Sequence, residues 1–275
     1  MNIEMNTIPK LSEQLKIPGQ VHIPLVVSGI GPESGKDFVV AAVRQNTGAK
    51  RDQDHLGYGL AMATGIPDRT AALKAKAVGN AAQYEDIRTR LLHFAYKGRQ
   101  EGFDYMITLC NTIHAWRGEL KDHLQEIGIP WMSIMDAVAA DLRLRYDKGT
   151  RIGVFATTGT LMTGLYRDAL TQVGLQPVEP DLESDVQNTI MAAIYDEGFG
   201  IKKAGATPEA KKLLLQAAQW ANHQNLEVVI EGCTEIPLAL NSETYNGTIA
   251  LINPMDALAS VALKYSFDGT MQFPG

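Results

Sequence analysis

The chemistry that this chain could perform is concentrated at two cysteines, the only ones among its 275 residues. Cys110 follows the apolar run 105–109 and Cys233 follows the apolar run 228–230, and both runs have the composition of buried strands. Polar residues that could open a helix come after each cysteine. Two thiols at matching places in two halves predict one site between the halves, with a thiol on each side of a substrate. Such a pair suits an enzyme that removes a proton from one face of a carbon and returns one to the other.

A metal site or a disulfide would also use these cysteines. Cys110 and His114 are four residues apart, which suits a metal or a Cys–His nucleophile, but no third and fourth ligand accompanies them. His114 also fits a hydrogen-bonded structural histidine. A disulfide between Cys110 and Cys233 is disfavoured because no secretory signal is visible and thiols stay reduced in the cytoplasm. We therefore expect two free thiols and no metal.

Arg69, in the segment 66–70, is the best candidate for binding a substrate anion, because a guanidinium offers a rigid fork that matches a carboxylate. An ordinary exposed loop arginine is the alternative. The turn 29–36 resembles a phosphate-binding loop at first sight. However, Ile30 stands where a Walker loop needs glycine, and Asp37 stands where it needs serine or threonine. What remains is a glycine-rich turn that could offer backbone N–H groups to an anion.

The elements that must position these residues alternate along the chain. Strands are predicted at 22–27, 105–109, 131–134, 151–155, 175–178, 226–230 and 248–252. Helices are predicted at 36–45, 71–100, 117–126, 136–146, 161–172, 185–197, 208–224 and 254–265. This alternation predicts parallel sheets covered by helices, with ligands beyond the carboxyl ends of the strands. The turns 28–32 and 156–160 follow corresponding strands of the two halves, which indicates a structural duplication.

Composition and charge exclude some classes of function. The chain is 45% hydrophobic and 20% charged, which are ordinary globular values. A net charge of -6 and a pI of about 5.5 argue against broad nucleic-acid or membrane-surface binding. No stretch of about 18 apolar residues is present to span a membrane. We expect a cytoplasmic protein that acts on a small molecule.

Taken together, these segments resemble the aspartate/glutamate racemase superfamily, and most closely its aspartate racemase branch. The anchors of the resemblance are Cys110-Asn111-Thr112-x-His114 and Gly232-Cys233-Thr234-Glu235. The Gly-Ile-Gly-Pro turn at 29–32 and the segment 66–70 add support in the right order, and the likeness extends from about Pro24 to Lys264. The chain departs from the family where Ser28 stands in place of a frequent glycine. Glutamate racemases usually carry an Asp-Ser-Gly turn at the first strand, which is missing here.

The resemblance implies two Rossmann-like α/β domains with parallel sheets, related by a pseudo-twofold duplication, with the active site in the cleft between them. Residues 20–130 plus 248–275 would form the N-terminal domain carrying Cys110, and residues 131–247 the second domain carrying Cys233. It also implies a homodimer that interconverts L- and D-aspartate without pyridoxal phosphate, metal or any other cofactor. A glutamate or hydantoin racemase and a maleate isomerase are the alternatives within the superfamily. A two-domain small-molecule binding protein is the non-enzymatic alternative.

By the same resemblance, Cys110 and Cys233 are the paired acid and base. The expected substrate-binding residues are Arg69, Asn111, Thr112, Thr158, Lys203, Thr234 and Gly31, with Lys202 as the alternative to Lys203. His114 and Glu235 are expected to support the site. The resting pair should be one thiolate and one thiol, because two thiolates in a dry cleft would repel each other. Helix N-termini after the cysteines would favour the thiolate form.

Overall fold

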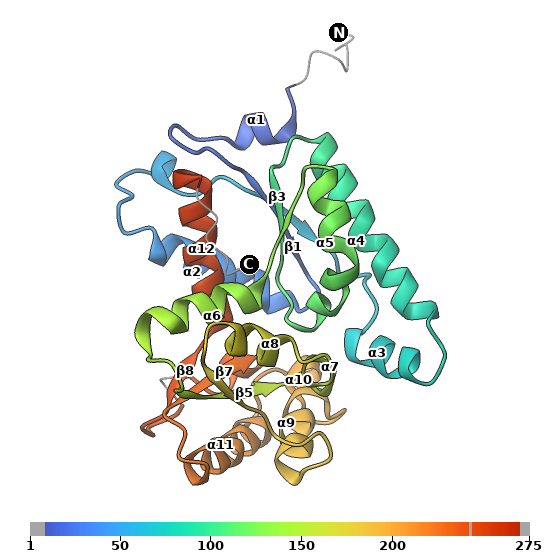
Figure 1. Ribbon diagram of the computed structural model, residues 1–275, viewed down its shortest axis with the longest axis vertical. Helices are drawn as coiled ribbons and strands as arrows, with labels where there is room; N and C mark the ends of the chain where they lie inside the picture. The colour runs from blue at the N-terminus through green and yellow to red at the C-terminus, as the bar shows by residue number, and fades with distance from the viewer. Residues whose placement is uncertain (1–8, 242–243, 270–275) are drawn as a thin grey trace.

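Two four-stranded parallel sheets, each covered by helices, make up the fold of this chain (Figure 1). A computed structural model describes residues 9–241 and 244–269. The first sheet contains β1 (Pro24–Ser28), β2 (Gly59–Met62), β3 (Tyr105–Thr108) and β4 (Trp131–Met132), in the order β2-β1-β3-β4. The second contains β5 (Arg151–Ala156), β6 (Gln176–Val178), β7 (Val228–Gly232) and β8 (Ala250–Ile252), in the order β6-β5-β7-β8. The same order in both halves confirms the predicted fold of two parallel sheets.

Helices connect the strands of each half. Those before β5 are α1 (Leu11–Leu15), α2 (Pro32–Gln45), α3 (Arg69–Ala77), α4 (Ala82–Gln100), α5 (Arg117–Glu126) and α6 (Ile134–Arg145). Those after β5 are α7 (Thr158–Met162), α8 (Leu165–Gln172), α9 (Asp185–Tyr195), α10 (Ile201–Ala204), α11 (Pro208–His223) and α12 (Pro254–Asp268). Short 3-10 turns are η2 (Asp52–Asp54), η3 (Thr112–Trp116) and η4 (Ile236–Leu238). Serine and threonine side chains cap several of these helices, as at Ser133, Ser184 and Thr207.

The central strands are buried along their length, as parallel strands covered on both faces must be. All residues of β1, β3 and β7 are buried. One continuous core runs from the first sheet into the second, through Val26 and Ile107 on one side and Val154 and Val228 on the other. Residues of α6 and α12 belong to the same core, so these two helices join the halves. Figure 1 shows α12, in red, lying beside α2.

Strand pairing shows where the chain passes between the two sheets. A division at residue 131 would remove β4 from its sheet, because Met106 and Ile107 of β3 pair with it in parallel. A division at residue 248 would remove β8, which pairs with Val228 to Ile230 of β7. The chain therefore crosses to the second sheet after Met132 and leaves it after Ile252. The last helix, α12, packs on α2 and α6.

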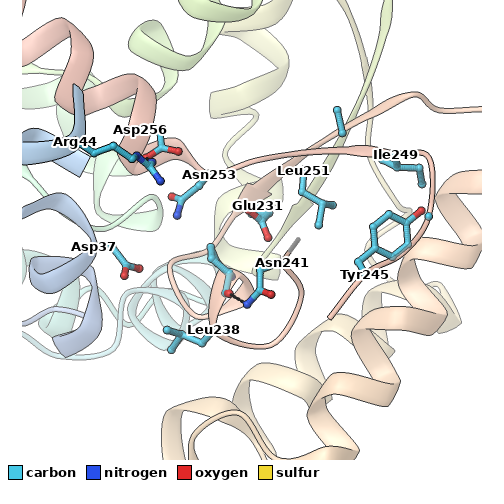
Figure 2. A pocket seen from close by; sticks show the side chains of 13 residues that line it. Asp37, Arg44, Glu231, Leu238, Asn241, Tyr245, Ile249, Leu251, Asn253 and Asp256 are labelled. Carbon is cyan, nitrogen blue, oxygen red and sulfur yellow. Dashed lines mark hydrogen bonds and ion pairs between the residues drawn. The ribbon is translucent and has the colours of Figure 1, made fainter. Parts of the chain in front are cut away.

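The two halves enclose several cavities. One small cavity is bordered by both cysteines. A separate cavity of about 530 Å³ has walls from α2, β7, β8 and the start of α12 (Figure 2). Across the part of the chain that the structure describes, no helix is long and apolar enough to cross a membrane.

Candidate active site

The two cysteines come from equivalent central strands and border one cavity. Cys110 is the second residue after β3, and Cys233 directly follows β7. Both are free and buried, with 7% and 6% of their surface exposed. Since β3 and β7 occupy the same position in their sheets, their carboxyl ends deliver the sulfur atoms from opposite halves. The structure thus brings the two thiols to one place.

The cavity between the cysteines is nearly closed. It measures about 10 Å³, roughly the space that one water molecule requires. Its walls are formed by Ile30, Arg69, Cys110, Asn111, Thr112, Thr157, Tyr195, Lys202, Cys233, Thr234 and Glu235. A bound amino acid would need the halves to move apart.

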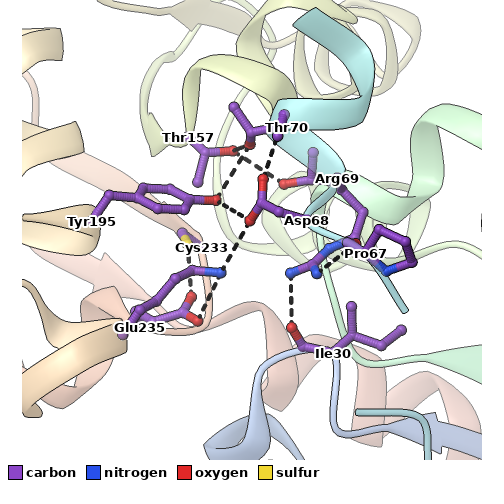
Figure 3. Close-up of polar contacts among 12 residues, drawn as sticks. Ile30, Pro67, Asp68, Arg69, Thr70, Thr157, Tyr195, Cys233 and Glu235 are labelled. Carbon is purple, nitrogen blue, oxygen red and sulfur yellow. Dashed lines mark hydrogen bonds and ion pairs between the residues drawn. The ribbon is translucent and has the colours of Figure 1, made fainter. Parts of the chain in front are cut away.

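Arg69 is fixed beside Cys110 as the first residue of α3. Asp68 caps this helix by accepting a 2.8 Å hydrogen bond from the backbone N–H of Ala71. The guanidinium donates to the backbone carbonyls of Ile30, at 2.7 Å, and Pro67, at 3.1 Å (Figure 3). Its buried Nε has no hydrogen-bond partner among the described residues. Burial tends to lower the pKa of Arg69, but the charges of Cys110 and Asp68 outweigh burial and raise it. The site therefore keeps a fixed cation at this position.

Asn111 presents a second hydrogen-bond donor without a partner. The hydroxyl of Tyr166 donates to Asn111 Oδ1 at 2.6 Å, which fixes the orientation of the amide. Burial raises the pKa of Tyr166 far above its ordinary value, so that hydroxyl stays a donor. The Nδ2 atom of Asn111 is buried, and no described residue accepts its hydrogen bonds. Two buried, unsatisfied donors at Arg69 and Asn111 make the cavity suited to a carboxylate.

Cys233 is held as a thiol by its surroundings. Its Sγ donates to Glu235 Oε2 at 2.8 Å, and Lys202 Nζ lies 3.5 Å from Glu235 Oε1. Burial, followed by the negative charge of Glu235, raises the pKa of Cys233 well above its ordinary value, with Lys202 opposing this rise. The expected helix N-terminus is reduced to η4, a single 3-10 turn of three residues. Burial and the carboxylate, rather than a helix dipole, therefore keep this sulfur protonated.

Of the two candidate lysines, Lys202 is the one that lines the cavity. Lys202 lines the cavity, with 24% of its side chain exposed, and it also lies 4.0 Å from Asp68 Oδ2. Lys203 points away, with 63% of its side chain exposed, and pairs with Glu197 at 2.9 Å. Neighbouring residues of a helix point about 100° apart, which agrees with the different directions of these two side chains.

The threonine that lines the cavity after β5 also lies one residue from the predicted one. Thr158 was predicted to contact the substrate, but it does not line the cavity, and its hydroxyl accepts from Gln187 at 3.3 Å. Thr157 takes the place. Its hydroxyl lies 3.1 Å from that of Thr112 and 3.3 Å from that of Thr70. These contacts link the two halves, because Thr70 and Thr112 belong to the first half and Thr157 to the second.

Two further predicted residues do not line the cavity between the cysteines. Gly31 has no room for a side chain, because a Cβ there would lie 2.9 Å from Thr234 Oγ1. His114 is buried, and its Nδ1 lies 3.0 Å from the carbonyl of Cys110, while the N–H of Ile134 donates to its Nε2 at 3.2 Å. These bonds place the proton on Nδ1. His114 thus positions the Cys110 backbone without lining the cavity.

Tyr195, at the end of α9, was not predicted from the sequence. Its ring lines the cavity, and its hydroxyl donates to Asp68 Oδ2 at 3.0 Å across the two halves (Figure 3). Burial raises the pKa of Tyr195, so the hydroxyl stays protonated. A single tyrosine at a helix end has no sequence pattern that would reveal this role. Within the described residues, no three His, Cys, Asp or Glu side chains form a group able to hold a metal ion.

The chain belongs to the Asp/Glu/hydantoin racemase family, whose model matches residues 27–262. It is similar to the broad-specificity amino-acid racemase RacX of Bacillus subtilis, with 20% identity over 219 residues that cover 78% of this chain and 86% of that protein. It is also similar to a glutamate racemase of Oceanobacillus iheyensis, with 26% identity over 134 residues that cover 48% of this chain and 44% of that protein.

Solved structures share the fold. The aspartate racemase of Picrophilus torridus superimposes with a TM-score of 0.64 at 24% identity, covering 90% of this chain and 95% of that one. Family membership and fold together define a racemase, an isomerase that acts on amino acids.

Proposed function

We propose that this protein interconverts L- and D-aspartate by a two-base mechanism that uses no cofactor. The observation that carries the proposal is the placement of Cys110 and Cys233 at one cavity, together with two unsatisfied donors. The donors, on Arg69 and Asn111, suit a carboxylate of the substrate. The thiols would then stand on the two faces of its α-carbon.

The surroundings of the two sulfurs suggest which one starts as the base. Cys110 adjoins the cation of Arg69, so we assign the thiolate to it. Cys233 donates to Glu235 and is the thiol. In one direction the Cys110 thiolate takes the α-proton, breaking the Cα–H bond and forming S–H, while the Cys233 S–H gives its proton to the opposite face. The reverse assignment operates on the other enantiomer, as microscopic reversibility requires.

The α-proton is weakly acidic, so negative charge must be stabilised as it develops on the carboxylate. Fixed donors in a closed, water-poor cavity provide this stabilisation without reorganisation during the reaction. The Asn111 amide and the Arg69 guanidinium are held in place by Tyr166 and by backbone carbonyls respectively. Their orientation therefore exists before the substrate binds.

Two cations at the cavity favour a dicarboxylic amino acid. Arg69 and Lys202 can each bind one carboxylate of the substrate, while Glu235 and Asp68 are the anions available to its ammonium group. The name of the P. torridus neighbour agrees with aspartate, and the name of the O. iheyensis relative makes glutamate the acid to compare.

Proton NMR in heavy water tests this proposal directly. The wild-type protein should exchange the α-proton of L- and D-aspartate and equalise the two enantiomers, and glutamate should react more slowly. Cys110→Ser and Cys233→Ser should each lower racemisation at least about 10³-fold, because one face loses its acid or base. Circular dichroism of both variants controls for folding. Full turnover by either variant, or no α-proton exchange by the wild type with either acid, would contradict the proposal.

A further inference from the structure

The cavity of about 530 Å³ between α2, β7 and α12 is separate from the cysteine site. None of its lining residues lines the cavity between the cysteines. It is much larger than the closed cysteine cavity and lies in the volume range of small-molecule sites. Its chemistry also differs from that of the cysteine cavity, because most of its polar side chains are asparagines or carboxylates (Figure 2).

Glu231, on β7, is the unusual residue of this cavity. Only 3% of its surface is exposed, and its Oε1 has no hydrogen-bond partner in the described part of the chain. Figure 2 shows its carboxyl group among the side chains that face the cavity. A buried carboxyl oxygen without a hydrogen-bond partner is costly, and natural proteins usually satisfy such atoms. The missing donor at Glu231 Oε1 points to a ligand that donates hydrogen bonds.

The charges around Glu231 add to a negative cavity. Asp37 and Asp256 also line it, and Arg44 is the only Lys or Arg among its lining residues. Arg44 is paired with Asp256. No described residue forms a salt bridge with Asp37 or Glu231, so two carboxyl groups remain available. A cation is the ligand that would compensate them.

The remaining walls suit an organic cation. Leu238, Ile249, Leu251 and the ring of Tyr245 provide apolar surface beside the carboxyl groups. We propose that this cavity binds a primary amine with a compact apolar body, its ammonium group directed at Glu231 and Asp37. The ammonium group supplies three donors, and the apolar body covers the leucine, isoleucine and tyrosine side chains.

Proton release should accompany this binding. Burial, with contributions from Asp256 and Asp37, raises the pKa of Glu231 to about 8. Near pH 7 the empty cavity therefore holds Glu231 mainly as the neutral acid. An adjacent ammonium ion favours the ionised carboxylate, so that amine binding should expel a proton from Glu231.

Calorimetric titration with 2-phenylethylamine, in two buffers of different ionisation enthalpy, tests the proposal without using racemase activity. We expect binding by the wild type, a buffer-dependent heat that reports proton release, and no binding of the neutral isostere 2-phenylethanol. Glu231→Gln keeps the shape of the side chain and should weaken amine binding at least tenfold. Asp37→Asn should weaken it less, because Asp37 is only partly buried. Asp52→Asn, on the exposed turn η2, is the matched control and should bind like the wild type.

Several results would overturn the proposal. No heat with up to about 10 mM amine means that the cavity has no useful affinity. Equal binding of 2-phenylethanol means that only apolar surface is recognised. Unchanged binding by both Glu231→Gln and Asp37→Asn places the amine elsewhere. Binding of Mg²⁺ that excludes the amine identifies an inorganic cation as the ligand. If Glu231→Gln does not fold, Asp37→Asn still decides the question.

Discussion

The sulfur atoms of the two cysteines lie next to side chains of opposite charge. Cys110 lies beside the guanidinium of Arg69, whereas Cys233 donates to the carboxylate of Glu235. These neighbouring charges of opposite sign give the two sulfurs different electrostatic surroundings, as the proposed division into a base and an acid requires. Lys202 lies next to Glu235 and opposes the rise in the pKa of Cys233. This lysine can therefore influence both substrate binding and proton transfer.

Replacing each of the two adjacent lysines by methionine should show which one belongs to the site and which one only to the surface. A hydrogen bond to a charged group contributes about 1.5–3 kcal/mol, so Lys202→Met should lower kcat/KM for aspartate roughly 10- to 100-fold. Lys203→Met is the matched control and should leave it within about twofold, because exposed ion pairs contribute little. Steady-state kinetics of both variants measure the difference. Equal losses would contradict the assignment of Lys202 to the site, and a larger loss for Lys203→Met would assign Lys203 instead.

Among the elements, the turn after β3 is tied to the helix that leaves the first sheet. His114 on η3 joins the carbonyl of Cys110 to the first N–H of α6, at Ile134. Burial, followed by the charge of Arg117, lowers the pKa of His114 to about 4. The folded state therefore holds neutral imidazole, and acid must favour the unfolded chain, in which this group titrates near its ordinary value.

Acid should destabilise the protein through His114. Its contribution to stability is complete above about pH 6.5 and is lost as the pH falls toward about 4, reaching roughly 3 kcal/mol. We expect the free energy of unfolding of His114→Gln to depend less on pH over this interval than that of the wild type. Urea titrations followed by circular dichroism measure it. His123→Gln, on the exposed face of α5, is the control and should keep the wild-type slope. Parallel curves for the wild type and His114→Gln would contradict this role.

Elements with a strong local pattern could be predicted from the sequence. The helix α5 begins and ends where it was predicted, at residues 117 and 126, and the buried strands β3 and β5 lie within one residue of their predicted ends. The edge strand β2 was missed because it has four residues and pairs with β1 alone. The predicted helix 161–172 is divided because Gly164 adopts a left-handed conformation, with φ of 65°.

Side-chain direction at the site was less predictable than element type. Cys110, Cys233, Arg69, Asn111, Thr112, Thr234 and Glu235 all line the cavity. Lys202 and Thr157 lie one residue from the predicted positions because α10 and α7 are short, and short helices have no hydrophobic periodicity that fixes their phase. Tyr195 contacts Asp68 from 127 residues away in the sequence, a contact that only the folded chain creates.

At the scale of the whole molecule, the closed cavity makes opening a necessary step. A cavity of about 10 Å³ is smaller than an amino acid, so we expect the halves to separate to admit a substrate and to close again around it. Two of the contacts across this edge are the 3.0 Å hydrogen bond from Tyr195 to Asp68 and the 4.0 Å approach of Lys202 to Asp68. Tyr195→Phe removes the first contact and preserves the cap that Asp68 gives to α3.

Loss of this hydrogen bond should favour the open form and expose the cysteines. A bond to a charged acceptor contributes about 1.5–3 kcal/mol, so Tyr195→Phe should speed modification of the buried thiols by Ellman's reagent roughly tenfold or more in the absence of substrate. Tyr96→Phe removes a 2.8 Å surface hydrogen bond to His123 and serves as the control, with the wild-type rate expected. Aspartate should slow the reaction of the wild type and of both variants, because its binding favours the closed form. If Tyr195→Phe reacts no faster than Tyr96→Phe, then the hydrogen bond between Tyr195 and Asp68 does not govern opening.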